Sequence, residues 1–153
     1  MRPGTENLAA IAALTRVIEK RAAELDENLK QAMQLKRVLV EGVRKISGAL
    51  ILPEGGDPLG ETHSPYILKC AFPPIPGEIL QRVLNDRGFA VSTGSACSSS
   101  RGKTNRVLEA MGTRVDMAES SIRISWGPTT SRNEIEAFLS AVAREAGILK
   151  EQL

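Results

Sequence analysis

Hydrophobic residues in the first third of the chain recur mostly at intervals of three or four, the spacing of one helical face. Glycine and proline do not interrupt this pattern between Thr5, a plausible N-cap, and Gly42. The pattern predicts a long amphipathic helix over residues 6–46, with room for one bend or break. About forty helical residues would reach roughly 60 Å, so we expect the helix to protrude or to bridge to another body. A coiled coil is the alternative, although the spacing drifts from strict heptads.

Four shorter apolar segments follow, bounded mainly by glycine, proline or polar residues, and each is typical of a strand. In the last of them Ile122, Ile124 and Trp126 share one face, while Arg123 points to the other face. Cys70 lies inside the second strand and is most simply a core residue. The four ranges are 49–52, 66–72, 89–91 and 121–126.

Three further helices are predicted around these strands. Pro76 suits the first turn of a helix that Gly88 closes, Thr104 is a candidate cap for a short helix that ends at Gly112, and a capping box at residues 131–134 opens the last helix. We expect these residues to face the core: Ile79, Leu80, Val83, Leu84, Val107, Leu108, Met111, Ile135, Phe138, Leu139, Val142 and Ala146.

Together these elements predict an α/β fold of the α+β kind: a short, mostly antiparallel sheet with helices on one face, preceded by the long helix. We divide the chain into residues 1–47, an interdomain motif with the long helix, and residues 48–153, a small C-terminal domain.

The composition excludes several classes of protein. The chain has 153 residues, the size of one domain, and its net charge of +2 and aromatic fraction of 3% do not indicate nucleic-acid or membrane binding. Two cysteines and one histidine cannot build a zinc site, and we expect no metal. The apolar run at residues 8–14 is too short for a membrane span or a signal peptide, so we expect a cytoplasmic, reducing environment.

The segment around Cys97 is the clearest candidate for chemistry. Cys97 is surrounded by Gly, Ala, Ser and Thr, which cannot form the wall of a core, and Arg101 and Lys103 follow. Nearby cations favour the thiolate, which is the nucleophilic form. A reactive, loop-borne Cys97 is therefore favoured over a structural one.

Three ordered motifs carry a family resemblance. Residues 91–99, Val-Ser-Thr-Gly-Ser-Ala-Cys-Ser-Ser, resemble the active-cysteine signature of cysteine desulfurases, a class V branch of the fold-type I pyridoxal-phosphate (PLP) enzymes. Residues 121–125, Ser-Ile-Arg-Ile-Ser, resemble their substrate-carboxylate strand, and residues 2–7 resemble the Arg-x-Gly-Thr segment before their long interdomain helix. The motifs cover nearly the whole chain.

The resemblance implies a role for one residue in each motif. Cys97 would be the catalytic nucleophile that takes sulfur from L-cysteine as a persulfide and releases L-alanine, for iron–sulfur cluster or thio-cofactor assembly. Arg123 would bind the substrate carboxylate, and Thr5 would contact the PLP phosphate of the other subunit. From the residues alone, a surface strand residue is the less favoured alternative for Arg123, and a plain helix cap is an even alternative for Thr5.

The sequence also departs from the family. The PLP lysine of such enzymes lies in a Ser-His-Lys turn, whereas His63 here is followed by Ser64. The seven lysines are expected mostly on helix or loop surfaces with ordinary pKa values, so we expect this chain alone not to hold PLP covalently and to be inactive.

Because the Ser-His-Lys turn is not found in this sequence, several functions remain open. The chain resembles the C-terminal part of a cysteine desulfurase, with the N-terminal PLP half or a second copy as partner and a scaffold protein as sulfur acceptor. A non-catalytic persulfide carrier, a dimerisation module, or part of a related enzyme such as selenocysteine lyase are the alternatives.

Overall fold

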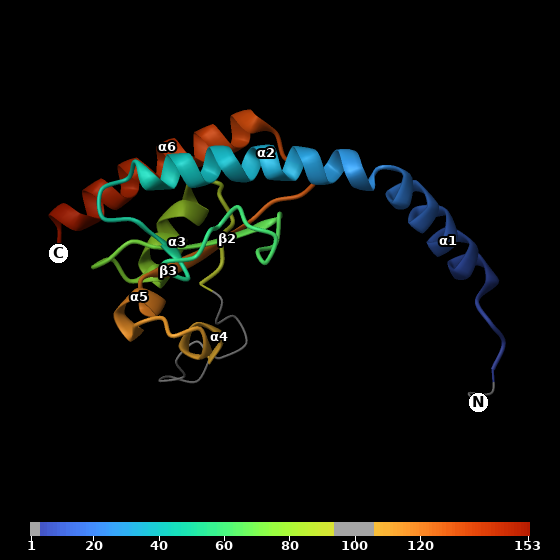
Figure 1. The fold of residues 1–153 in the computed structure, drawn as a ribbon, viewed down its shortest axis with the longest axis horizontal. Helices are drawn as coiled ribbons and strands as arrows, with labels where there is room; N and C mark the ends of the chain where they lie inside the picture. Colours follow the sequence, from blue (N-terminus) through green and yellow to red (C-terminus); the bar gives the residue numbers. More distant parts are fainter. Residues whose placement is uncertain (1–3, 94–105) are drawn as a thin grey trace.

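The computed structural model describes residues 4–93 and 106–153. The predicted long helix is present as two helices, α1 (Leu8–Ala23) and α2 (Leu25–Arg44), which meet at Glu24. The cap of α1 is Asn7, whose side chain accepts a hydrogen bond from the Ala10 amide, so the prediction of Thr5 as the cap is wrong. Figure 1 shows that α2 lies along the body of the molecule, while α1 extends away from it.

Three antiparallel strands form the sheet, in the order β1 (Leu50–Leu52), β2 (Ile67–Ala71) and β3 (Ser121–Ser125). The strand predicted over residues 89–91 is absent, and only Ser92 forms a single bridge, with Arg123. In place of a strand partner, the Val91 carbonyl accepts a hydrogen bond from the Gln81 side chain. Phe89 and Val91 still pack against the core as half-buried residues.

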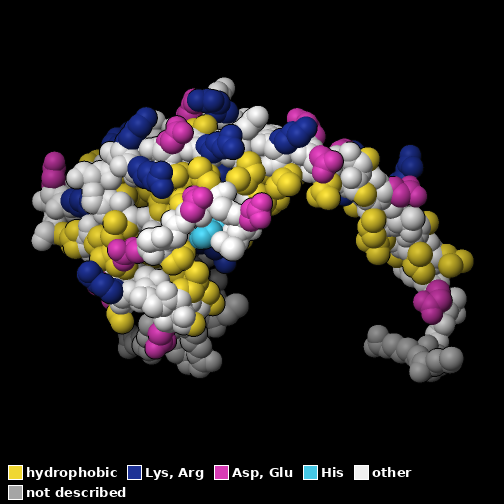
Figure 2. Space-filling view, viewed as in Figure 1, with side chains coloured by type: hydrophobic (Ala, Val, Ile, Leu, Met, Phe, Trp, Pro, Cys, Tyr) yellow, Lys and Arg dark blue, Asp and Glu magenta, His cyan; other side chains and the backbone are white. Residues whose placement is uncertain are grey.

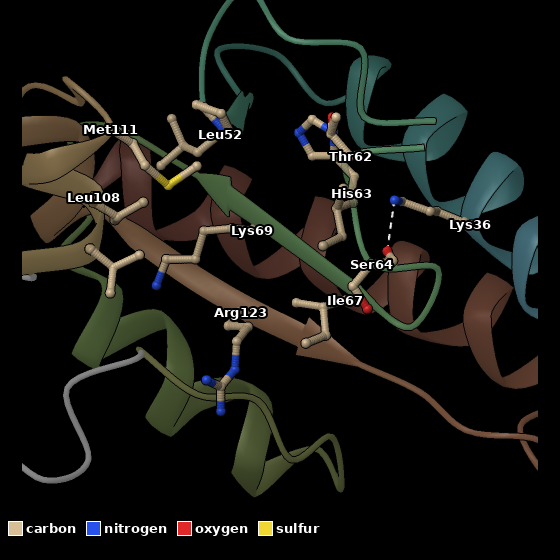
Figure 3. A pocket seen from close by; sticks show the side chains of 13 residues that line it. Lys36, Leu52, Thr62, His63, Ser64, Ile67, Lys69, Leu108, Met111 and Arg123 are labelled. Carbon is tan, nitrogen blue, oxygen red and sulfur yellow. Dashed lines mark hydrogen bonds between the residues drawn. The ribbon is translucent and has the colours of Figure 1, made fainter. Parts of the chain in front are cut away.

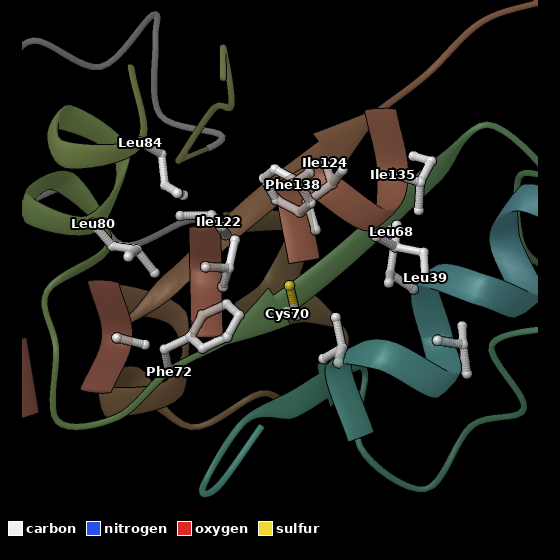
Figure 4. Packing of buried hydrophobic residues seen from close by; sticks show 14 of the residues in the cluster. Leu39, Leu68, Cys70, Phe72, Leu80, Leu84, Ile122, Ile124, Ile135 and Phe138 are labelled. Atoms are coloured by element: carbon white, nitrogen blue, oxygen red, sulfur yellow. The ribbon is translucent and has the colours of Figure 1, made fainter. Parts of the chain in front are cut away.

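The main core lies between the sheet and three helices, α2, α3 (Gly77–Asp86) and α6 (Arg132–Glu151) (Figure 4). Alternation in β2 and β3 directs Leu68, Cys70, Ile122 and Ile124 into this core. The predicted capping box is confirmed at the start of α6. On α3 the prediction for Ile79 is wrong: its side chain is 44% exposed, because Leu80 and Leu84 form the buried face.

A smaller core lies at one end of the other face of the sheet. It joins Leu52 and Ala71 to the short helices α4 (Arg106–Ala110) and α5 (Val115–Glu119) through Leu108, Met117 and Ala118. The sequence did not predict α5, which is too short to show a helical period. Val107 and Met111, expected to face inward, are 67% and 50% exposed, because Leu108 is the residue of this segment that reaches the core.

The α+β fold class is therefore confirmed, with short helices on the second face as an addition to it. None of the described helices is long and apolar enough to cross a membrane. The α1 helix has no buried residue, and its apolar side chains form a continuous surface on the inner side of the projecting helix (Figure 2). This surface, called the α1 stripe, comprises Leu8, Ile11, Leu14, Val17 and Ile18, all at least 49% exposed.

Candidate functional site

Arg123 lies in the centre of β3 and projects from the sheet face opposite the main core. Its neighbours Ile122 and Ile124 are buried in that core, which forces the arginine to the other side. The backbone of Arg123 exchanges both of its hydrogen bonds with Ser92. No hydrogen bond or ion pair to the Arg123 guanidinium is found within residues 4–93 and 106–153, and Arg123 lines a pocket.

Lys69 on β2 lies directly opposite Arg123. The backbone of Arg123 bonds to Ser92 and not to Lys69. The Lys69–Arg123 pair is therefore of the non-hydrogen-bonded antiparallel kind, in which Cα atoms are about 4.5 Å apart and side chains are close. The Lys69 Nζ donates to the Thr93 carbonyl at 2.8 Å. Burial, with the charge of Arg123 as a second cause, lowers the pKa of the Lys69 amine from 10.5 to about 8.

Both cations line a pocket of about 310 Å³. Figure 3 shows that Lys69 and Arg123 leave adjacent strands on the same side, while His63 and Lys36 lie toward the other end. The described lining residues include three cations and no Asp or Glu, and the other walls are mainly apolar. The pocket is therefore suited to a small anion with an apolar body. It is lined by Lys36, Leu52, Pro53, Thr62, His63, Ser64, Ile67, Leu68, Lys69, Val107, Leu108, Met111 and Arg123.

Lys36 is buried at 1% exposure on the inner face of α2. Its Nζ donates to the Ser64 carbonyl at 2.8 Å, and burial lowers the pKa of the amine. The expectation of surface lysines with ordinary pKa values is therefore wrong for Lys36 and Lys69. The alternation of side chains along each strand was the signal that could have revealed Lys69. It places Lys69 in β2 and Arg123 in β3 on the sheet face opposite the main core.

The structure describes only one of the two cysteines. Cys70 is fully buried in the main core, as predicted, and burial raises the pKa of its thiol to about 12. Cys97 lies outside the described residues, so its predicted role stays a prediction. Within residues 4–93 and 106–153, no group of three His, Cys, Asp or Glu side chains could hold a metal ion.

Thr5 is not brought to the pocket. It is an exposed residue of the segment before α1, and that segment lies at the end of α1 remote from the sheet (Figure 1). The described residues thus bring Arg123 together with Lys69, which the sequence did not predict. The role of Thr5 across subunits stays a prediction.

The aminotransferase class-V family model matches residues 1–138. This chain therefore belongs to the aminotransferase class-V family. Among its relatives is a cysteine desulfurase IscS of Methanosarcina thermophila, 32% identical over 141 residues, which are 92% of this chain and 34% of that protein. A second is the cysteine desulfurase of Homo sapiens, 30% identical over 99% of this chain and 32% of that protein. The chain spans about a third of the length of these relatives.

Solved structures show the same similarity. A NifS-like protein superposes with a TM-score of 0.76 and 30% identity, covering 96% of this chain and 35% of that chain.

The family is in general PLP-dependent. Arg123 and Lys69 fit an anionic group next to such a cofactor. The histidine that lines this pocket, His63, precedes Ser64 rather than a lysine, so the described pocket residues do not include the Ser-His-Lys turn of the family.

Proposed function

We propose that this chain is the sulfur-accepting part of a PLP-dependent cysteine desulfurase, which converts L-cysteine to L-alanine and a protein persulfide. The observation that carries the proposal is the Arg123 guanidinium, which has no partner among the described residues and projects into a pocket with no described acid. A planar carboxylate suits such a guanidinium, because two parallel hydrogen bonds can form. The class V family and the cysteine desulfurase relatives support the reaction type.

Each proposed residue has one task. Arg123 binds the α-carboxylate and so orients the substrate sulfur. The Cys97 thiolate attacks that sulfur, forming an S–S bond while the substrate C–S bond breaks, and the carbon takes up a proton to give L-alanine. Thr5 contacts the phosphate of PLP across subunits. PLP, when bound, supplies the electron sink for this reaction.

The proposed function also implies partners. The lysine that holds PLP comes from an N-terminal half, supplied either as a separate chain or within a longer one, and a second copy of this chain completes a homodimer. A scaffold protein then takes the sulfur from Cys97 for iron–sulfur cluster or thio-cofactor assembly. The cytoplasm is the compartment we propose, because a reducing environment keeps Cys97 as a thiol.

Adding L-cysteine and PLP to the pure chain, with and without an N-terminal half that carries the PLP lysine, tests this function. We expect sulfide and alanine only when both parts are present, and loss of both products in Cys97→Ala. Activity that survives in Cys97→Ala would contradict the proposed role of Cys97. Failure of a folded complex of the two parts to form alanine would contradict the function itself.

A second candidate is a non-catalytic persulfide carrier or dimerisation module. The exposed α1 stripe favours it, because such a surface suits a partner. This candidate requires association but no alanine production, so the same assay separates the two.

A further inference from the structure

The pairing of Lys69 with Arg123 is unfavourable for the fold by itself. Two like charges directly opposite each other on antiparallel strands repel, and a cross-strand pair of this kind destabilises a sheet. The described pocket residues include no acid that could neutralise the pair. On its other side, Lys69 pairs with Leu52 of β1, which adds no charge. An anion in the pocket would relieve the repulsion.

The Lys69 ammonium is also held in place. It donates one hydrogen bond to the Thr93 carbonyl, which is itself next to the Ser92–Arg123 bridge. An ammonium has three donors, so others remain for a ligand. The anchoring carbonyl fixes the lysine beside Arg123 before any ligand binds, which lowers the entropy cost of forming a second contact.

We infer that Lys69 is a second cationic positioning residue of the Arg123 site, so that a substrate carboxylate is bound by the guanidinium and the ammonium together. This inference rests on the proposed function, and it names the ligand class as a small carboxylate with an apolar body. The apolar walls, which include Leu52, Ile67 and Met111, accommodate that body.

The pair makes anion binding depend on pH. Lys69 is charged below its pKa of about 8 and loses its proton as the pH rises through that value, so affinity for a carboxylate falls between pH 7 and 9.5. A carboxylate ligand stays ionised throughout this range, and an arginine does too. Cys70 remains a neutral thiol because its pKa is about 12.

Two other titratable residues line the pocket, Lys36 and His63. Lys36 is 1% exposed and donates to the Ser64 carbonyl, so its ammonium faces the protein. His63 contacts the Thr62 hydroxyl, and the variant His63→Gln serves as the control for its contribution.

The experiment titrates propionate into the full 153-residue chain and follows the backbone amides of β2 and β3 by NMR at pH 7 and 9.5. We expect wild type and His63→Gln to bind about fivefold more weakly at the higher pH. Lys69→Met should bind about fivefold more weakly at pH 7 and show no further loss, whereas Lys69→Arg should bind well at both pH values. Circular dichroism checks that each variant is folded. If Lys69→Met does not fold, Lys69→Arg still tests the inference.

The outcomes separate this inference from the proposed function. If Arg123→Gln abolishes propionate binding while wild type and Lys69→Met bind equally at both pH values, the carboxylate role of Arg123 stands and the inference about Lys69 is wrong. A purely structural Lys69 would also leave wild-type binding independent of pH, because a neutral amine still donates to Thr93. If Arg123→Gln binds as wild type does, the carboxylate site itself is contradicted.

Discussion

Single residues of this chain owe their chemistry to the strand face on which they lie. Cys70 and Lys69 are neighbours in β2, yet alternation buries the thiol in the main core and places the amine in the pocket. Burial raises the pKa of Cys70 to about 12 and lowers that of Lys69 to about 8, because in each case the charged form is disfavoured. The same physical cause therefore makes one residue inert and the other titratable near neutral pH.

We expect Cys97 to alkylate at least tenfold faster than Cys70 in the folded chain. The Cys70 thiolate is a negligible fraction at pH 7.5 and its sulfur is shielded, whereas nearby cations in the sequence favour the Cys97 thiolate. Peptide mass spectrometry after limited iodoacetamide treatment measures the two rates, with the unfolded chain as control. Equal alkylation rates of the two cysteines in the folded chain would contradict the assignment of Cys70 to the core and Cys97 to a loop.

Whole elements show how far the sequence alone predicts the structure. The helix stripe of α2, the capping box of α6 and the alternation of β3 are strong local patterns, and all were predicted. Ile79, Val107 and Met111 in the shorter helices were expected to face inward and are exposed, because a few helical turns define a face poorly. The pairing of Lys69 with Arg123 depends on strand register across more than fifty residues, which no local pattern specifies.

The close contact between α3 and β3 gives a prediction at this scale. A Cβ on Gly77 would lie 2.5 Å from the Ser121 carbonyl oxygen, so Gly77→Ala must displace the start of α3 from the strand. We expect it to reduce the free energy of unfolding by about 1–3 kcal/mol. The matched control is Gly147→Ala in α6, where no atom lies within 4 Å of the added carbon, and stability should rise by about 0.5–1 kcal/mol. Urea unfolding measures both, and a neutral Gly77→Ala would contradict the packing.

At the scale of the molecule, the α1 stripe is the surface that we expect a partner to cover. Leu8, Leu14 and Ile18 are 75%, 61% and 57% exposed, and α1 contributes no buried residue to either core. An apolar surface of this kind is a contact site or an aggregation liability in water. The proposed N-terminal half and a second copy of the chain are the two partners that would cover it.

We therefore expect the pure chain to self-associate as its concentration rises, with an apparent mass above that of one copy in light scattering. Leu14→Glu should weaken this association by at least tenfold, because it buries a charge in the contact. Ala9→Glu, on the other side of α1, should leave it nearly unchanged. A strict monomer at high concentration, with the α1 amides protected from hydrogen exchange, would show that α1 folds back on its own domain.

The central claim, that this chain accepts sulfur from L-cysteine on Cys97, is tested most directly by mapping the persulfide. The chain is incubated with L-cysteine, PLP and the N-terminal half, trapped with an alkylating agent, digested and analysed by mass spectrometry. The account predicts a gain of one sulfur atom on the Cys97 peptide, alanine formed in equal amount in a single turnover, and loss of both in Arg123→Gln. Sulfur on Cys70, or alanine released with no persulfide on Cys97, would contradict it.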